Sequence, residues 1–391
     1  MIYEPWPGST YADETGSMRS GPSSRGSLIA RETGKPPISS ESWTIPLQAA
    51  MGGVILSRRQ FIQGALALTG VSLLSGCGDL PSWPQPTAKV RRIGYLTLGS
   101  GPPPGPGTDY DALRQGLREY GWVEGENIAI EYRSAEERSE RLPDLAAELV
   151  RLAVDVLVAG GGTQAALAAK HATDTIPIVA IGVADPVDSG LVASLARPGG
   201  NVTGLATAGA EITSKRLDLL KEAVPGVSRV DFLWNPATPG LQAQWTELQV
   251  AARALGVSVR SREAREADDL DSAFGAIAGE RPDGLVIQGS PSFVPHARRI
   301  ADFAAGNRLP AMYYWREFAE AGGLLVYGPN LRDLSRHAAT YLDKILRGTK
   351  PADLPVAKPT VFDFVVNLKT AQALGLTIPQ SVLQQATELI Q

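Results

Sequence analysis

Cysteine and histidine are scarce in this chain of 391 residues, which holds one cysteine, Cys77, and three histidines. A lone thiol cannot close a disulfide within the chain, and so few nitrogen and sulfur ligands leave little material for a transition-metal site. The net charge is −4 and the pI about 5.6, with no basic stripe in the sequence. We therefore expect no bound metal, no cofactor and no nucleic-acid partner.

The signatures of common enzyme classes are also missing. The turn Gly160-Gly161-Gly162-Thr163 lacks the Gly-Lys-Ser/Thr of a phosphate-binding loop. The sequence contains no Gly-x-Ser-x-Gly elbow and no His-Glu-x-x-His helix. Without a recognisable nucleophile–base pair, we predict that the protein is not an enzyme. An exported enzyme that uses Asp185 or His296 as its acid or base is the alternative from another class.

An apolar run long enough to span a bilayer as a helix, about eighteen residues, does not occur after Cys77. The apolar run before Cys77 covers residues 61–76 and follows the basic pair Arg58-Arg59. A basic segment, a short apolar segment and small residues before a cleavage point are typical of an export signal, which we predict at residues 51–76. The order Leu-Ser-Gly-Cys at 74–77 resembles the bacterial lipoprotein box, in which the cysteine is lipidated and begins the mature chain.

The export route stays open, because Ser57-Arg58-Arg59-Gln60-Phe61 resembles a twin-arginine signal while plain Sec export fits as well. Residues 1–50 are polar, Gly/Ser-rich and aperiodic, so we interpret them as disordered, with the hypothesis that translation begins at Met51. Residues 77–88 contain the stiff stretch PSWPQP and are interpreted as a linker. The predicted location is the periplasm or the cell surface, with membrane contact through lipid on Cys77.

From Lys89 onward, short apolar runs rich in β-branched residues alternate with segments of helical periodicity. Runs that are apolar on both faces, such as residues 154–161 and 176–183, are typical of parallel strands covered by helices on both sides. The predicted strands are too many for the sheet of one α/β domain of ordinary size. We predict an α/β fold with two doubly wound, Rossmann-like lobes joined by several crossovers. Lobe 1 is predicted at residues 89–204 plus about 328–354, and lobe 2 at 205–327 plus about 355–391.

Candidate ligand contacts follow from this fold, because ligands of open parallel sheets bind beyond the carboxyl ends of the strands, where helices begin. After the strand at 154–161, Gly162 and Thr163 offer backbone N–H groups and a hydroxyl that could hold a carboxylate. The next strand runs into Asp185, a candidate partner for an ammonium group. The other predicted contacts at strand ends are Pro186, Val187, Trp234, Asn235, Gln288, Tyr314 in the aromatic loop 313–315, and Tyr327.

Each of these residues also has a purely structural interpretation. Small residues after strands often form nothing more than tight turns. Asp185 is equally suited to cap the next helix. The aromatic side chains of Trp234, Tyr314 and Tyr327 could pack between the lobes instead of stacking on a ligand.

Two long segments carry a resemblance to a known family. DPVDSGLVASLARPGGNVTG at 185–204 and FDFVVNLKTAQALGLTIPQSVL at 362–383 closely resemble the ABC transporter substrate-binding proteins that include the tryptophan- and tyrosine-type binding proteins. The likeness extends over about residues 89–383. It implies a type I periplasmic-binding-protein fold. It also implies capture of a small-molecule ligand, with an amino acid as one candidate, and delivery to ABC permease and ATPase subunits.

Within this resemblance, Gly162-Thr163, Asp185-Pro186-Val187 and Tyr327 match positions where the family lines its cleft. Residues 191–204 are interpreted as scaffold, a helix that ends at Arg197-Pro198 and is followed by a return strand. The closed arrangement of the lobes is expected to be favoured only when ligand bridges them. A lipoprotein receptor that senses its ligand and signals to a membrane partner is an alternative that the sequence does not separate from transport.

Overall fold

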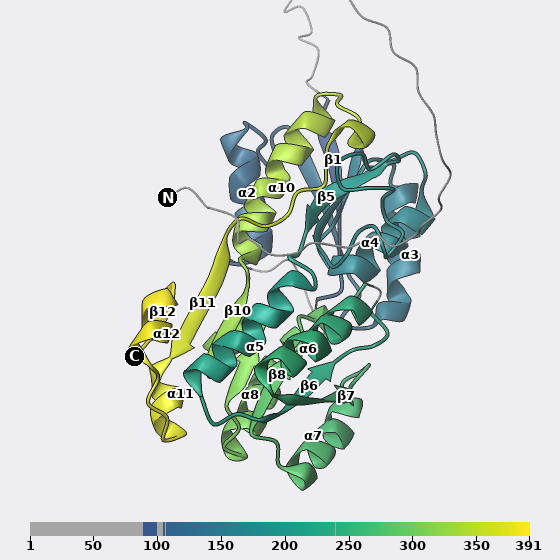
Figure 1. Ribbon diagram of the computed structural model, residues 1–391. Helices are drawn as coiled ribbons and strands as arrows, with labels where there is room; N and C mark the ends of the chain where they lie inside the picture. Colours follow the sequence, from purple (N-terminus) through teal and green to yellow (C-terminus); the bar gives the residue numbers. More distant parts are fainter. Residues whose placement is uncertain (1–88, 100–104, 106, 239) are drawn as a thin grey trace, which may run out of the picture. The chain divides into compact units, whose positions relative to one another are not determined.

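The computed structural model describes residues 89–99, 105, 107–238 and 240–391. The predicted disordered segment 1–50, export signal 51–76 and linker 77–88 with the lipidation site Cys77 lie outside these residues. The described chain is built on two β-sheets that are flanked by helices (Figure 1). We call the five-stranded sheet with its helices the first lobe, and the seven-stranded sheet with its helices the second lobe.

The sheet of the first lobe has the strand order β2-β1-β3-β4-β5, and every strand pair is parallel. Successive side chains of a strand point to opposite faces. Leu96 and Leu157 therefore pack on one face with α3 and α4, while Tyr95 and Val158 pack on the other with α2 and α10. The elements are β1 (Arg91–Thr97), α2 (Asp109–Glu119), β2 (Ile128–Ser134), η1 (Ser139–Arg141), α3 (Leu142–Arg151), β3 (Val156–Ala159), α4 (Gly162–Ala172), β4 (Ile178–Val183), β5 (Val202–Ala206) and α10 (Leu331–Leu346).

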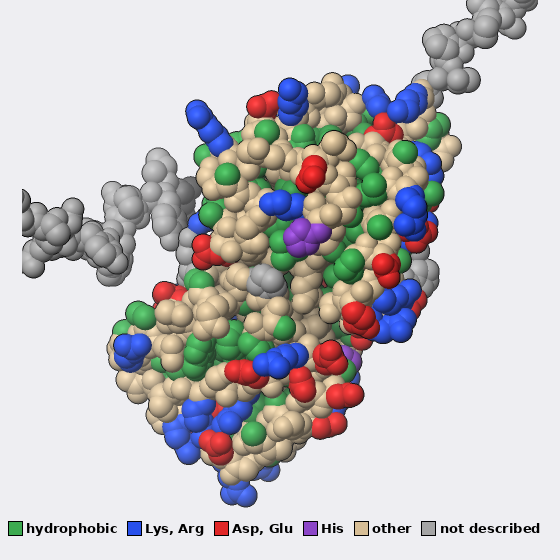
Figure 2. Space-filling view, turned by 90° about the vertical axis from the view of Figure 1, so that its right-hand side faces the viewer, with side chains coloured by type: hydrophobic (Ala, Val, Ile, Leu, Met, Phe, Trp, Pro, Cys, Tyr) green, Lys and Arg blue, Asp and Glu red, His purple; other side chains and the backbone are tan. Residues whose placement is uncertain are grey.

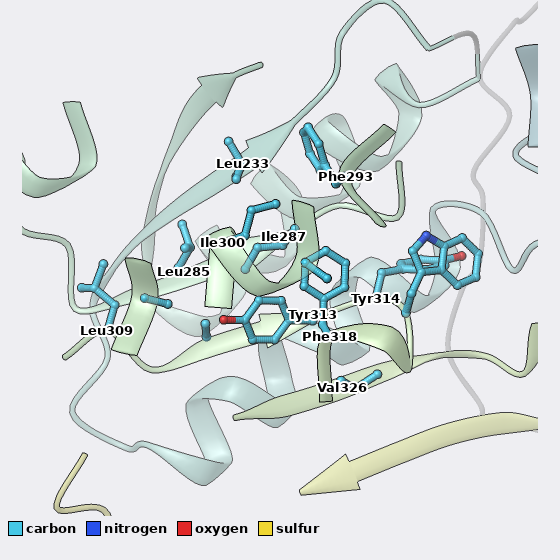
Figure 3. Packing of buried hydrophobic residues seen from close by; sticks show 14 of the residues in the cluster. Leu233, Leu285, Ile287, Phe293, Ile300, Leu309, Tyr313, Tyr314, Phe318 and Val326 are labelled. Carbon is cyan, nitrogen blue, oxygen red and sulfur yellow. The ribbon is translucent and has the colours of Figure 1, made fainter. Parts of the chain in front are cut away.

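The sheet of the second lobe has the order β7-β6-β8-β9-β10-β11-β12, and its first five strands repeat the order of the first lobe. Helices α5 and α6 cover one face, and α7, α8 and α9 cover the other. Figure 3 shows the core under α8 and α9, where the rings of Tyr313 and Phe318 stack with centroids 4.9 Å apart. The elements are α5 (Glu211–Ala223), β6 (Arg229–Trp234), α6 (Gln242–Leu255), β7 (Ser258–Glu263), α7 (Asp269–Glu280), β8 (Gly284–Ile287), η2 (Pro291–His296), α8 (Ala297–Gly306), β9 (Ala311–Tyr313), α9 (Glu317–Glu320), β10 (Leu325–Pro329), β11 (Phe362–Asn367), α11 (Leu368–Ala373), α12 (Gln380–Gln385) and β12 (Glu388–Ile390).

The described chain passes between the lobes after β5, after β10, and again between η3 (Pro351–Asp353) and β11. The last passage is fastened to the first lobe, since Thr203 Oγ1 donates to the Leu354 carbonyl at 2.6 Å and Ala357 pairs with Leu205. Because β11 returns from the first lobe, it pairs with β10 in the antiparallel sense, which the sequence did not predict. The predicted fold class of two doubly wound α/β lobes joined by several crossovers is confirmed.

The helix predicted to end at Arg197 is wrong, because residues 186–200 form turns and bends. Asp185 has a φ of 38° and precedes a proline, and this backbone does not start a helix. The side chain of Ser194 accepts from the Arg197 N–H and donates to its carbonyl, each at 3.1 Å. Such local bonds compete with the helical ladder. The return strand that was predicted next is present as β5.

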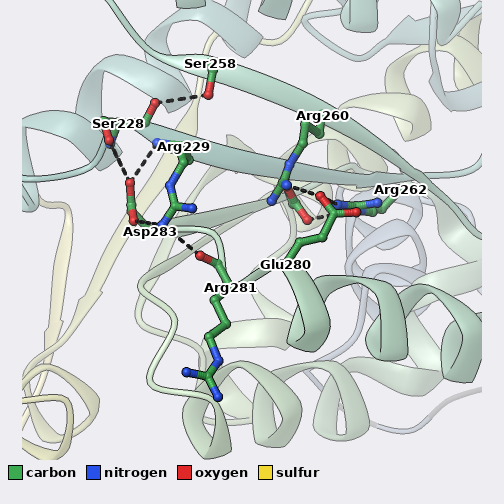
Figure 4. A network of polar contacts seen from close by, with 9 residues as sticks. Ser228, Arg229, Ser258, Arg260, Arg262, Glu280, Arg281 and Asp283 are labelled. Carbon is green, nitrogen blue, oxygen red and sulfur yellow. Dashed lines mark hydrogen bonds and ion pairs between the residues drawn. The ribbon is translucent and has the colours of Figure 1, made fainter.

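A buried charge network holds β7, the edge strand of the second sheet, to β6 (Figure 4). Asp231 is fully buried and accepts hydrogen bonds from Arg260 Nε at 2.8 Å and Arg262 Nε at 2.6 Å. Glu280, in the last turn of α7, pairs with Arg260 Nη1 and, at 2.9 Å, with Arg262 Nη2. Charged side chains therefore reinforce the backbone ladder between these two strands.

Charges of both signs are interspersed over the face shown in Figure 2. The described residues contain no group of three or more His, Cys, Asp or Glu side chains arranged to hold a metal ion. No helix among them is both long and apolar enough to cross a bilayer.

Candidate ligand-binding site

A cavity of about 280 Å³ opens at the carboxyl ends of the first-lobe strands and is lined by residues of both lobes. In doubly wound sheets, ligands bind where the strand order reverses. In the first lobe this point lies between β1 and β3. Thr97 at the end of β1, and residues 98–99 and 160–162 after the two strands, line the cavity. The second lobe contributes residues of η2 and the segment around Trp315. The position of the cavity therefore follows from the topology of the sheet.

Aromatic rings form much of the cavity wall. Tyr95 and Tyr132 are register partners on β1 and β2, and their rings stack with centroids 5.4 Å apart. Tyr110 on α2 packs edge-on against both, at 5.0 and 5.3 Å. Burial raises the pKa of Tyr110 and of Tyr132 to about 12 and that of Tyr95 well above its ordinary value, so all three phenols are neutral at neutral pH. Trp315 lines the cavity from the second lobe.

Gly160 makes room for this wall. A Cβ atom at this position would lie 2.1 Å from the hydroxyl oxygen of Tyr95 and 2.4 Å from its Cζ. Both contacts are much shorter than van der Waals separations, so only glycine lets the ring of Tyr95 lie against the end of β3. The glycine-rich turn after β3 thus has a packing role in addition to any role in binding.

The cavity contains two carboxylates, one from each lobe. Asp109 is the first residue of α2, and Glu317 is the first residue of α9. Burial is the main cause that raises the pKa of both groups, and the charge of Asp109 raises that of Glu317 further. The positive charge of Arg332 acts in the opposite direction on both. They are the only charged side chains among the described residues that line this cavity.

The start of α4 supplies hydrogen-bond donors, which suit a negatively charged group of a ligand. No side chain caps this helix, whose N-cap is Gly161, and Gly161 and Gly162 both line the cavity. The first backbone N–H groups of a helix attract anions. Thr163, by contrast, is committed within the first lobe, since its hydroxyl accepts from the Ala184 N–H at 3.1 Å and donates to the Ala184 carbonyl at 3.3 Å.

A second, much smaller cavity of about 10 Å³ adjoins the first and shares Gly161, Gly162, Gly182 and Pro291 with it. Thr163 and Tyr314 line it, and its volume suits about one water molecule. Burial raises the pKa of Tyr314 to about 12. The ring of Tyr314 lies 5.1 Å from the guanidinium carbon of Arg216, whose pKa burial lowers to about 10.

Asp185, Pro186 and Val187, in the turn after β4, lie outside the lining of both cavities. Asp185 Oδ1 accepts a hydrogen bond from the Asp188 N–H at 3.0 Å and so closes its own turn. Val187 is 40% exposed. Pro186 lines a different small cavity, next to β5.

The remaining predicted contacts of the second lobe also lie outside the lining of both cavities. Trp234 is buried among Phe232 and Trp245, and its indole N–H donates to Ser261 Oγ at 2.7 Å. Asn235, Gln288 and Tyr327 contact residues of neighbouring strands. Gln288 Oε1 accepts from the Asn235 N–H at 3.1 Å, and the ring of Tyr327 packs on those of Phe362 and Phe364. Of the ten predicted contacts, the structure thus brings Gly162, Thr163 and Tyr314 together.

The aromatic and acidic residues of the larger cavity were not among the contacts predicted from the sequence. Trp315 was included only as the end of an aromatic loop. Asp109 and Glu317 stand in the first turns of α2 and α9, where acidic residues are common for electrostatic reasons alone. One signal in the sequence could have indicated the aromatic wall. Tyrosines at matching positions of two predicted strands lie side by side when these strands pair in parallel register.

Comparison with known proteins identifies the family. Residues 104–390 match the family described as ABC transporter substrate binding protein, which is most of the chain. The chain belongs to this family. Its members are solute-binding proteins and not enzymes.

Individual relatives agree with this assignment. The chain is 26% identical over 318 residues to a tyrosine-binding protein of Clostridioides difficile (strain R20291), with 78% of this chain and 89% of the relative covered. A conserved domain protein from Vibrio cholerae superposes with a TM-score of 0.70 at 29% identity, over 77% of this chain and all of that one. An ABC domain in complex with L-Trp from Streptococcus pneumoniae gives a TM-score of 0.70 at 24% identity, over 77% and 99%. The fold is that of the type I periplasmic binding proteins.

Proposed function

We propose that this substrate-binding protein captures an amino acid with an aromatic side chain and delivers it to the permease and ATPase of an ABC importer. The observation that carries this proposal is the cavity at the strand ends, with a wall of three tyrosines from the first lobe and Trp315 from the second. The aromatic ring of a ligand packs favourably against other aromatic rings in offset or edge-on geometry. The likeness to a tyrosine-binding protein supports the same class of ligand.

The proposed ligand is a zwitterion, and the charges at the site are arranged to suit one. Its carboxylate would meet the uncapped N–H groups at the start of α4, around Gly161 and Gly162. Because the ligand would touch both lobes at once, it would bind the closed arrangement more tightly than an open one and shift the population toward it. A permease can then distinguish loaded from empty protein by the geometry of the lobes.

A thermal-shift screen tests the ligand class. L-tyrosine, L-tryptophan and L-phenylalanine at about 100 times their Kd should stabilise the purified protein by about 2.7 kcal/mol, because only the folded state binds them. L-alanine, which keeps the zwitterion but lacks the ring, is the matched control and should give a much smaller rise in Tm. An equal rise with L-alanine, or no rise with any aromatic amino acid, would remove this ligand class.

We also propose that the protein is exported and anchored to the membrane outside the cytoplasm through a lipid on Cys77. Support comes from the sequence alone, from the apolar segment before Cys77 and the Leu-Ser-Gly-Cys order. Replacing Cys77 with serine should move the protein from the membrane fraction to the soluble extracytoplasmic fraction and remove the mass of the acyl groups. Membrane association that survives Cys77→Ser, with an unmodified thiol in the wild type, contradicts the anchor.

A further inference from the structure

We infer that Asp109 and Glu317 together bind the amino group of the ligand, so that one cation is held by a carboxylate from each lobe. This inference rests on the proposed function only in placing the ligand in the larger cavity. It goes further in naming the group that the protein requires, a protonated amine, and the two residues that select for it. Neither residue is among the contacts that the sequence suggested.

The balance of charge in the cavity is the first argument. Its lining contains two carboxylates and no lysine, arginine or histidine side chain among the described residues. Arg332 on α10 influences both acids from outside the lining, but it is half exposed and its Nη2 lies 3.6 Å from Glu320 Oε1. The cavity therefore lacks a cation of its own to pair with the two acids.

The cost of leaving these acids unpaired is the second argument. A carboxylate that is removed from water without a cation beside it is destabilised. Backbone N–H hydrogen bonds lower the pKa of Asp109 and Glu317, but burial outweighs them and raises the pKa of both. Two such groups in one cavity repel each other, and the charge of Asp109 acts on Glu317 in this way. A ligand cation placed between them would relieve both penalties, so it would be bound strongly.

The surroundings of the acids are the third argument. Three tyrosine rings and an indole line the same cavity, and the faces of such rings attract ammonium groups. Trp315 is 4% exposed, and its indole N–H has no hydrogen-bond partner among the described residues. A buried donor without a partner costs free energy unless a ligand or water supplies an acceptor. This donor suits an acceptor such as the carboxylate of the ligand, while the aromatic rings suit its ammonium group.

Three probes that differ by one group test which part of the ligand is required. L-tyrosine carries both charges, 2-(4-hydroxyphenyl)ethylamine lacks the carboxylate, and 3-(4-hydroxyphenyl)propanoate lacks the amine. By isothermal titration at neutral pH, we expect the amine to bind and the propanoate not to bind measurably. Binding of the propanoate as tightly as the amine, or failure of the amine to bind, overturns the inference.

Variants test the two residues. Glu317→Gln and Asp109→Asn should each weaken binding of the amine by roughly ten- to a hundredfold, since each removes one charge-assisted hydrogen bond. The double variant should lose less than the product of the two factors if both residues hold the same group. Glu119→Gln makes the same chemical change at the last residue of α2, in an exposed pair with Arg336 outside the lining, and should leave the affinity within about twofold. Equal affinities in the wild type, the two single variants and the double variant overturn the inference.

The pH dependence of amine affinity distinguishes direct binding by these two acids from a purely structural role. Arg332 from α10 lowers the pKa of both acids, and Glu320 from α9 raises that of Glu317. Asp109 in turn raises the pKa of Tyr95 and Tyr132 on the neighbouring strands, which burial raises most. Because the pKa of each acid is raised, each takes up its proton at a higher pH than usual, and amine affinity should fall as the pH is lowered from about 7.5 to about 5. The folding stability of the ligand-free protein is expected to change with pH in the opposite direction. Ionising these buried acids costs stability, and this cost appears as the pH rises through their folded pKa values.

Both variants should therefore fold. Ligand-free Glu317→Gln and Asp109→Asn should melt at the wild-type temperature or above it at neutral pH. The outcomes also separate the two proposals. If the amine binds and aromatic amino acids do not, the acid pair stands and the amino-acid assignment falls. If L-tyrosine binds with the same affinity to wild type and to both variants, the assignment stands and the acid pair falls.

Discussion

Gly160→Ala is expected to lower ligand affinity by roughly a hundredfold, because over-packing of a well-filled site typically costs 1–3 kcal/mol. The new Cβ would lie 2.1 Å from the Tyr95 hydroxyl oxygen. Tyr95 cannot turn aside without disturbing Tyr110 and Tyr132, whose ring centroids lie 5.0 and 5.4 Å away. The ring would therefore move into the cavity or displace its neighbours. Isothermal titration with an aromatic amine or amino acid that binds the wild type measures the loss.

Gly200→Ala is the matched control for this substitution. An added Cβ at Gly200 meets no atom within 4 Å, so both affinity and Tm should stay at wild-type values. Circular dichroism of Gly160→Ala should retain the α/β spectrum, with a loss of stability of about 1–3 kcal/mol. Wild-type affinity in Gly160→Ala would show that the tyrosine wall does not contact the ligand.

Asp231→Ala is expected to destabilise the second lobe by about 3–5 kcal/mol, the range found when one partner of a buried ion pair is removed. Asp231 is fully buried between Arg260 and Arg262, and Arg262 is itself 13% exposed. The substitution leaves both guanidinium groups with Glu280 as their remaining acidic partner. Urea denaturation monitored by tryptophan fluorescence is a suitable measurement, because Trp234 and Trp245 lie in this lobe.

Asp302→Ala separates the effect of burial from that of losing an Asp–Arg pair. Asp302 pairs with Arg298 on the exposed face of α8, at 2.9 Å, with side chains 59% and 77% exposed. Such a pair contributes at most about 0.5 kcal/mol. A cost for Asp302→Ala equal to that for Asp231→Ala would contradict the argument that burial makes the Asp231 network important.

The lobes could be predicted from the sequence because their cause is local. A parallel strand that is buried on both faces must be apolar throughout, and a helix that covers it must be amphipathic, so both leave a periodic pattern. The antiparallel β11 left no such sign, since its direction depends on where the chain returns from the first lobe. The turns at 186–200 were missed because Ser194 and Asp185 form local hydrogen bonds that periodicity does not reveal.

The candidate site was predictable only in part, because it is assembled from side chains that are distant in sequence. The topological rule predicted ligand contacts at the start of α4, where Gly162 lines the cavity. Asp109 and Glu317 line the same cavity because the first residues of α2 and α9 both reach it. No local pattern in the sequence indicates this. Asp185 looked more promising by sequence because it follows a strand, yet its carboxylate closes its own turn.

A crystal structure grown with the aromatic amino acid that raises the Tm most tests the central claim directly. The account predicts ligand density between the lobes, with the ring against Tyr95, Tyr110 or Tyr132 and the amino nitrogen within hydrogen-bond distance of both Asp109 and Glu317. Density at any other place, or an amino group directed away from both carboxylates, would contradict it.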